Sequence, residues 1–205
     1  MVSIIISGMA GVGKSTVAAM ISKELGMELK VGGDLLKEYA KNLGFTGTER
    51  IDFWDTEEGK KFLELRTQNE LFDKELDAYL NRLINQKELV ITSWSLPWIS
   101  EGNHVKVWLK ASQQTRARRI SKRDSISLEK ALEIVKTRDE ENYQHYKKLY
   151  GIELDKDLSV FNVVIDTEHV DPATISKMLI AYYRSYKMYL SEEYEKNCGS
   201  ANRKD

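Results

Sequence analysis

The sequence predicts an α/β fold, a three-layer arrangement in which helices cover both faces of a doubly wound, five-stranded parallel sheet. Five short apolar segments predict the strands, at residues 2–7, 28–31, 89–92, 105–110 and 163–166. Apolar side chains at nearly every position are typical of strands buried on both faces of a parallel sheet. A stretch long enough for a helix separates each segment from the next, and this alternation indicates a doubly wound sheet.

Helices are expected behind each predicted strand. Two of them have clear starts, because Ser127 can cap one helix and Asp171 followed by Pro172 places a capping residue beside a first-turn proline. The expected helices cover residues 15–25, 34–43, 58–86, 112–123, 127–150 and 172–189. Residues 191–205 have little apolar content and are expected to form a flexible polar tail.

The length of 205 residues indicates a single domain, here residues 1–190. Two charged excursions interrupt the alternation of strands and helices, at about residues 43–77 and 116–157. Excursions that follow the carboxyl ends of strands in an open α/β sheet can fold over the ligand crevice. Both segments are therefore expected to cover a bound ligand.

The composition argues against several classes of partner. The 31 basic and 32 acidic residues give a net charge of −1, so no global field draws the protein to a nucleic acid polymer or to an anionic membrane. The apolar run at residues 4–6 is far too short for a signal peptide or a membrane span. Cys198 is the single cysteine, which excludes an intramolecular disulfide and fits a cytoplasmic location. The oligomeric state is left open.

A phosphate-binding motif follows the first predicted strand. Residues 8–15 read GMAGVGKS and match G-x-x-x-x-G-K-S/T between a strand and a helix. The glycines permit backbone conformations in which successive N–H groups converge on phosphate oxygens, and the helix adds its positive end. Lys14 is expected to bridge the β- and γ-phosphates of ATP, and the Ser15 hydroxyl to ligate Mg²⁺. The expected nucleotide-binding residues are Gly8, Met9, Ala10, Gly11, Val12, Gly13, Lys14, Ser15 and Thr16.

The acidic residue that usually accompanies such a loop is missing from the third strand. That strand ends in Thr92, Ser93 and Trp94, with no carboxylate. Asp34, which follows two glycines after the second strand, is the nearest substitute. Two interpretations stay open: Asp34 caps the helix that begins at Leu35, or it caps that helix and also contributes to the metal site and to catalysis.

A basic cluster, RARRISKR, follows the fourth strand at residues 116–123. On a helix Arg116, Arg119 and Arg123 are spaced i, i+3 and i+7, so they share one face. Arginine suits phosphate because its planar guanidinium forms paired hydrogen bonds and neutralises the charge that develops during transfer. The alternative is a solvated basic helix face.

The sequence resembles the nucleoside monophosphate kinases, P-loop proteins, and most closely the archaeal-type cytidylate kinases. The resemblance is carried by ISGMAGVGKST, GGDLLKEYAK, DKELD, VWLKAS with RARRISKR, and the run that begins at Arg138. It implies an acceptor-binding insertion at residues 43–77 and a lid at residues 116–157. It also implies that Arg119 packs on adenine, that Arg123 reaches the phosphates and that Arg138 is a retained active-site arginine.

The acceptor side departs from the family pattern. Where the family carries arginines for the monophosphate, this chain has Lys37, Ala78 with Tyr79, Trp94 and His145. None of these side chains can replace a guanidinium at a bidentate phosphate site. The candidates to replace the lost charge are Arg50, Lys60 and Arg66, each with the alternative of a solvated helix charge.

Three functions remain open, with a nucleoside monophosphate kinase that uses a CMP-like acceptor placed first. Its acceptor is already an anionic nucleophile and needs no general base. The second is a kinase for a hydroxyl acceptor, in which Asp34 takes the proton and Tyr79, Trp94 and Trp98 line the pocket. The third is a nucleotide-binding regulatory protein without acceptor turnover.

Overall fold

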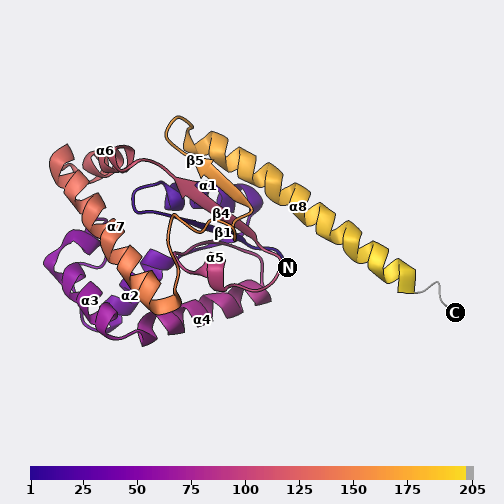
Figure 1. Ribbon diagram of the computed structural model, residues 1–205, viewed down its shortest axis with the longest axis horizontal. Coiled ribbons are helices and arrows are strands. Elements are labelled where there is room, and N and C mark those ends of the chain that lie inside the picture. The colour runs from indigo at the N-terminus through magenta and orange to yellow at the C-terminus, as the bar shows by residue number, and fades with distance from the viewer. Residues whose placement is uncertain (202–205) are drawn as a thin grey trace.

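Five parallel strands form the centre of the molecule, as the sequence predicts. In the computed structural model, which describes residues 1–201, the sheet has the order β2-β3-β1-β4-β5 (Figure 1). The strands are β1 (Ile4–Gly8), β2 (Glu28–Val31), β3 (Leu89–Thr92), β4 (Val105–Lys110) and β5 (Val163–Asp166). All four neighbouring pairs are parallel, so the carboxyl ends of the strands meet at one edge. The predicted doubly wound α/β fold is confirmed.

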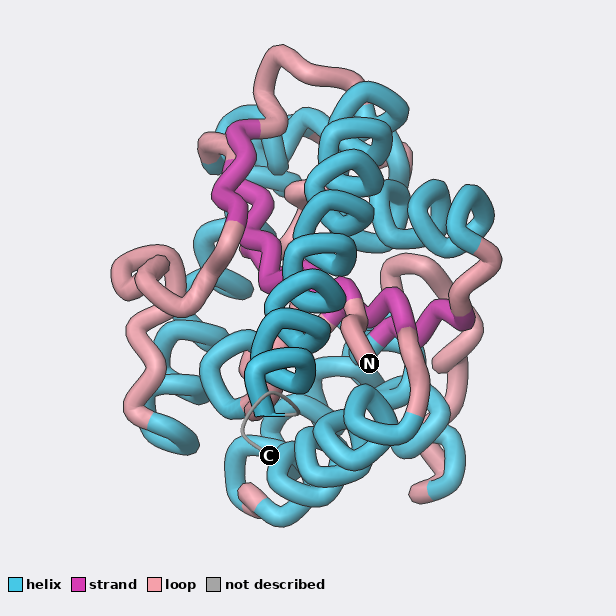
Figure 2. Tube along the Cα trace, turned by 90° about the vertical axis from the view of Figure 1, so that its right-hand side faces the viewer, coloured by secondary structure: helices cyan, strands magenta, loops and turns pink. Residues whose placement is uncertain are grey.

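Helices cover both faces of this sheet. On one face α1 (Lys14–Leu25) and α8 (Pro172–Ala201) pack together against side chains such as Ile4 and Ile6 of β1. Figure 2 shows α8 running across the sheet on this side. On the other face α4 (Leu71–Gln86) and the short α5 (Leu96–Ile99) pack on Ile5 and Ile91. The alternate side chains of β1 therefore belong to two separate cores.

The remaining helices are α2 (Gly32–Asn42), the 3₁₀ turn η1 (Phe53–Asp55), α3 (Glu57–Gln68), α6 (Gln113–Asp124) and α7 (Leu128–Tyr150). The turn η1 and α3 lie in the expected acceptor insertion, and α6 with α7 makes up most of the segment expected to be the lid. None of the helices described within residues 1–201 combines the length and the apolar character that a bilayer span requires.

The prediction of a single helix at residues 58–86 is wrong, because the helix is interrupted at Asn69. The backbone there is extended, at φ −124° and ψ 93°, and the Asn69 side chain accepts a hydrogen bond from the Leu71 N–H. Asparagine competes for backbone partners in this way. The break also lets Arg66 meet Asp73, whereas seven residues along a continuous helix span about 10 Å.

The helix end predicted at Tyr189 is too early. Helix α8 continues to Ala201 and extends beyond the body of the molecule (Figure 1). Leucine and glutamate, as at Leu190 and Glu192, are good helix formers and carry the pattern onward. The flexibility of residues 191–205 stays a prediction, and residues 202–205 of that segment lie outside the described chain.

Candidate active site

The loop at residues 8–15, here called the P-loop, has the backbone geometry that its glycines predict. Gly8, Gly11 and Gly13 have φ values of 143°, 77° and 104°, in the region that favours glycine. At Gly8 a Cβ atom would lie 2.3 Å from the Leu109 carbonyl oxygen of β4. Glycine is therefore required at this position both by conformation and by the close approach of the neighbouring strand.

Lys14 lies at the first position of α1 and points over the loop. Its Nζ donates hydrogen bonds to the carbonyl oxygens of Gly8, at 2.6 Å, and Met9, at 3.0 Å, and lies 4.7 Å from the centroid of the Trp94 ring. Burial lowers the pKa of Lys14 to about 7, and the positive charges of Arg116 and Arg138 lower it further. Cationic groups thus lie close together around the loop, and a bound polyphosphate would reduce the repulsion between them.

Two arginines of α6 donate hydrogen bonds to carbonyl oxygens of the P-loop. Arg116 is buried, donates to the Ala10 carbonyl at 3.1 Å and forms a paired ion pair with Asp139 at 2.9 and 2.6 Å. Arg119 donates to the Val12 carbonyl at 3.0 Å and to the hydroxyl and carbonyl of Thr167 at 2.9 and 2.5 Å. The interpretation of this face as merely solvated is therefore wrong for both residues.

The other two arginines of the predicted site pair with carboxylates outside the P-loop. Arg123 is about 40% exposed and pairs with its neighbour Asp124, at 2.6 and 2.7 Å. Arg138 of α7 instead pairs with Asp55 of η1, which belongs to the acceptor insertion. The structure thus brings Arg116 and Arg119 onto the P-loop, whereas Arg123 pairs with Asp124 and Arg138 with Asp55.

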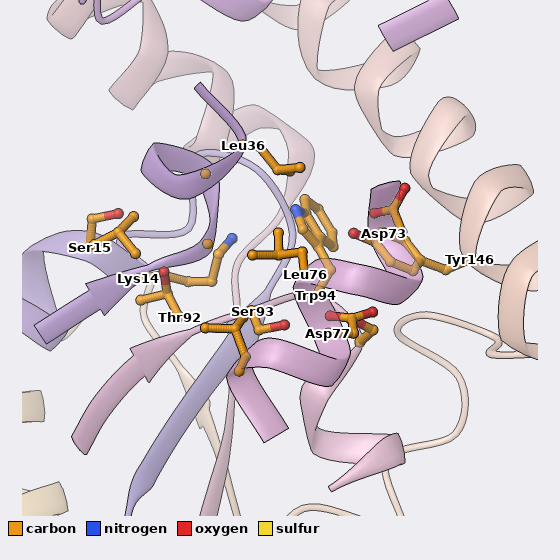
Figure 3. A pocket seen from close by; sticks show the side chains of 15 residues that line it. Lys14, Ser15, Leu36, Asp73, Leu76, Asp77, Thr92, Ser93, Trp94 and Tyr146 are labelled. Atoms are coloured by element: carbon orange, nitrogen blue, oxygen red, sulfur yellow. The ribbon is translucent and has the colours of Figure 1, made fainter. Parts of the chain in front are cut away.

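A cavity opens beside the P-loop at the carboxyl ends of β2 and β3, and it is called the acceptor cavity below. Figure 3 shows Lys14 and Ser15 on one side of it and Asp73, Asp77 and Tyr146 on the other. Leu36 and Leu76 supply apolar wall, and the segment from Thr92 to Ser95 lines the base. This is where ligands bind in open α/β sheets.

The two carboxylates of the cavity lie one turn apart on α4 but differ in charge state. Although burial opposes ionisation of Asp73, hydrogen bonding from His145 and the charge of Arg66 hold its pKa at about 2. Burial raises the pKa of Asp77 to about 6, against hydrogen bonds donated by Ser95 and Tyr150, both at 2.7 Å. Asp73 is therefore an ionised partner of Arg66, whereas Asp77 takes up a proton at a higher pH than an ordinary aspartate.

Comparison with known proteins agrees with this geometry. A sequence profile described as the cytidylate kinase-like family matches residues 3–169. The chain belongs to the cytidylate kinase-like family. Cytidylate kinase from Sulfurisphaera tokodaii is 36% identical over 187 residues, covering 87% of this chain and 93% of the relative. Cytidylate kinase from Pyrobaculum aerophilum is 36% identical over 171 residues, covering 83% and 86%. The predicted resemblance and enzyme class, a kinase, are confirmed.

Solved structures share the fold of this cytidylate kinase-like protein at low sequence identity. An uncharacterized protein from Eubacterium ventriosum has a TM-score of 0.65 at 18% identity, covering 90% of this chain and 98% of its own. Shikimate kinase from Acinetobacter baumannii has a TM-score of 0.54 at 15% identity, covering 91% and 95%. At such identities the likeness shows the P-loop kinase fold alone.

The cap predicted at Asp34 is wrong, because α2 begins at Gly32, three residues before Leu35. Its N-cap is Val31, which makes no side-chain cap, and Asp34 is an exposed residue of the first turn. The glycines before it, Gly32 and Gly33, line the acceptor cavity, whereas Asp34 itself is not among the lining residues. The metal and catalytic roles of Asp34 stay predictions.

The residues expected to replace the family's arginines are already paired. Arg66 is buried against Asp73 and donates to the Tyr146 hydroxyl at 2.8 Å, so its charge is neutralised. Arg50 pairs with Asp52 in an exposed position, and Lys60 lies 3.5 Å from the carboxylate of Glu57. None of the three lines the cavity. In this arrangement they therefore do not supply the positive charge that was expected to replace the family's arginines.

The aromatic lining predicted for a hydroxyl acceptor is only partly correct. Trp94 lines the acceptor cavity and stacks on Tyr146, with ring centroids 5.9 Å apart. Trp98 instead packs edge-on against Phe161 in the core, and Tyr79 lines a separate apolar groove between α2 and α4. Alternating hydropathy does not reveal which way each aromatic side chain points, because that depends on distant packing partners.

Sequence reasoning missed the buried carboxylates Asp73 and Asp77 as site residues. The signal was present, since acidic residues spaced i and i+4 share one helix face. Here that face also carries Leu80 and Ile84, which are fully buried or nearly so. Charged residues on the apolar face of a helix are candidates for a site, because burial of a carboxylate needs a compensating partner.

Proposed function

We propose that this protein transfers the γ-phosphoryl group of ATP, in the presence of Mg²⁺, to a small molecule bound in the acceptor cavity. The observation that carries the proposal is that Lys14 and Ser15 of the P-loop line the same cavity as the end of β3 and the buried face of α4. Donor and acceptor would thus meet at Lys14. The family supports a nucleoside monophosphate of CMP type as the first candidate acceptor.

On the donor side, the backbone N–H groups of residues 8–16 would bind the phosphates of ATP. Lys14 would leave its loop carbonyls and bridge the β- and γ-phosphates as a fixed cation. Arg119, which is held between the P-loop and Thr167, would pack on adenine, as the resemblance implies. Arg123 and Arg138 would add positive charge when the lid at residues 116–157 closes.

The residues also fit a Mg²⁺ ion. Ser15 places a hydroxyl oxygen at the start of α1 and on the cavity surface, and hard oxygen ligands are those that Mg²⁺ prefers. Asp34, in the turn behind Gly33, is the proposed second residue of the metal site. When bound, the ion would neutralise charge on the β- and γ-phosphate oxygens.

A nucleoside monophosphate acceptor would need positioning and charge neutralisation, without a base. Of the described residues that line the cavity, Lys14 alone is positively charged. Arg138 could join it only by leaving Asp55. The near-zero net charge supports a small-molecule partner over a nucleic acid polymer or a membrane, and the single cysteine fits a cytoplasmic location.

A kinase for a hydroxyl-bearing acceptor is the second candidate function. The observation that favours it is that, among the described residues, the acceptor cavity is lined by the carboxylates of Asp73 and Asp77 and by no arginine. A carboxylate repels a phosphate dianion but accepts a hydrogen bond from an alcohol.

The experiment that tests the proposed function is a panel of acceptors incubated with ATP and Mg²⁺, with ADP release as the readout. CMP and other nucleoside monophosphates, nucleosides and sugars form the panel. Acceptor-dependent ADP release supports phosphoryl transfer, and the responding class identifies the acceptor. ATP binding without ADP release for any acceptor would support a regulatory nucleotide-binding protein instead.

A further inference from the structure

Arg116 is the one arginine of the predicted phosphate-binding face, Arg116, Arg119 and Arg123, to which the proposed function gives no part. Its side chain is 3% exposed. Nε donates to the Ala111 carbonyl at 3.3 Å, Nη1 to the Ala10 carbonyl at 3.1 Å, and Nη1 and Nη2 to the Asp139 carboxylate at 2.9 and 2.6 Å. These bonds use most of the donors that a guanidinium offers, so Arg116 is not free to ligate a phosphate directly.

Asp139 of α7 fixes this arrangement from a second helix. It is 6% exposed, pairs with both Nη groups of Arg116 and accepts a further hydrogen bond from the Gln113 amide at 3.0 Å. A buried, paired contact of this kind holds a guanidinium in one orientation, because rotation would leave two buried charges without partners. Arg116 is therefore held against the P-loop by α7 as well as by its own helix.

The hydrogen bond from Arg116 to Ala10 also sets the direction of the next N–H group in the P-loop. The peptide bond between Ala10 and Gly11 is trans. In a planar trans peptide the carbonyl of one residue and the N–H of the next point in opposite directions. Because the Ala10 carbonyl is held toward Arg116, the Gly11 N–H is directed away from it.

The Gly11 N–H has no acceptor within residues 1–201, the part of the chain that the structure describes. On the side of α6 the loop is closed, because a Cβ atom on Gly11 would lie 3.1 Å from Cδ1 of Ile120 and 3.2 Å from the Arg116 carbonyl oxygen. Gly11 is nevertheless only half-buried, so its other side is accessible. A backbone N–H that is directed outward without a partner is suited to an anionic oxygen.

Building on the proposed binding of ATP, we infer that Arg116 and Asp139 are positioning residues for the donor phosphates, which hold the Ala10 carbonyl so that the Gly11 N–H points at the polyphosphate. Neither side chain contacts the nucleotide. The N–H group is oriented before the ligand arrives, so binding requires less rearrangement of the loop. The basic cluster thus serves the donor site through the loop backbone as well as through its charge.

The test removes the pair without changing the net charge of the protein. Arg116→Met combined with Asp139→Leu replaces a buried ion pair with apolar side chains, a change that proteins often tolerate. Although burial is the main cause of the lowered pKa of Lys14, Arg116 lowers that pKa further and Asp139 raises it, so removing both disturbs Lys14 less than removing Arg116 alone. The matched control is Arg118→Met combined with Glu140→Leu, which removes exposed charges of both signs from the same two helices.

Calorimetric titration measures the affinity for a non-hydrolysable ATP analogue with Mg²⁺ and for inorganic tripolyphosphate, which carries no base. Loss of an oriented hydrogen bond to a phosphate should weaken both ligands by about tenfold or more in the double variant. The control should bind both ligands as the wild type does, and circular dichroism verifies the fold of each variant. In the wild type the amide NMR signal of Gly11 should shift when either ligand binds, and the shift should be smaller in the double variant.

Unchanged affinity for both ligands in the folded double variant would overturn the inference. So would a loss confined to the ATP analogue, which would indicate an effect on the base, or a Gly11 signal that does not respond in the wild type. Where the double variant does not fold, Asp139→Asn takes its place and should weaken both ligands in the same direction. Failure of the wild type to bind the ATP analogue would instead overturn the proposed function itself.

Discussion

Arg138 on α7 donates two hydrogen bonds to the carboxylate of Asp55, from Nε at 3.0 Å and from Nη2 at 2.6 Å. The two residues are 83 positions apart, and the ion pair joins the expected lid to the expected acceptor insertion. Both side chains are largely buried, at 15% and 18% exposure. The arginine proposed for the active site is therefore held on the expected acceptor insertion, and the ion pair ties that segment to the expected lid.

Replacing Asp55 with Asn should loosen this connection. The variant leaves a mostly buried guanidinium without its counter-ion, so we expect a loss of about 1–3 kcal/mol in the free energy of unfolding. Hydrogen exchange should also quicken in α7 and η1. The control is Glu57→Gln, which removes an exposed partner of Lys60 and should cost no more than about 0.5 kcal/mol. Equal stability of the two variants would contradict the structural role of the Asp55–Arg138 pair.

Replacing Lys14 with Ala should abolish turnover without unfolding the chain. The backbone of the P-loop remains, but the transferring phosphoryl group loses its fixed cation, so the rate should fall by on the order of 10² or more. Steady-state ADP release with ATP and Mg²⁺ measures the effect, and circular dichroism verifies the fold. Lys23→Ala, an exposed lysine of the same helix, should retain the wild-type rate. A wild-type rate in the Lys14 variant is the result that excludes phosphoryl transfer at this loop.

Replacing Arg119 with Ala should weaken ATP binding. The variant loses both the surface proposed for adenine and the hydrogen bonds that join the P-loop at Val12 to Thr167. A cation stacked on an aromatic ring contributes about 0.5–2 kcal/mol, so affinity should drop by roughly tenfold. Calorimetric titration with a non-hydrolysable ATP analogue provides the measurement. Arg118, adjacent in sequence but exposed, is the control, and equal losses at both positions would indicate a general electrostatic effect.

Replacing Asp77 with Asn should change how stability depends on pH. The folded pKa of about 6 lies above the ordinary 3.8, so the folded state holds a proton that the unfolded state releases between these values. Below about pH 4 Asp77 is protonated in both states and has no effect on stability. As the pH rises to about 6 the unfolded state is favoured progressively, and above that pH the wild type is destabilised by up to about 3 kcal/mol. Relative to wild type, the variant should gain stability as the pH rises from 4 to 7, as urea unfolding would measure. A difference independent of pH would contradict the raised pKa.

The strands, the P-loop and the family could be predicted because each is encoded in contiguous residues. The apolar runs set four of the five strand segments to the observed bounds, and the spacing of Gly8, Gly13 and Lys14 defined the phosphate-binding turn. The helix boundaries were predicted less accurately than the strands. The break at Asn69 and the early start of α2 at Gly32 depend on contacts that local propensity does not contain.

The sequence by itself determined the sheet, the donor loop and the loss of the family's acceptor arginines. Only the tertiary structure decided what stands in their place. Tyr150 reaches Asp77 across 73 residues, and Tyr146 reaches Arg66 across 80. The charge state of a buried carboxylate is set by burial and by partners that folding brings within hydrogen-bonding distance, and these vary independently of the local sequence pattern. Hence Arg66, a candidate phosphate ligand in the sequence, is an ion-pair partner in the fold, while Asp77 lines the acceptor cavity.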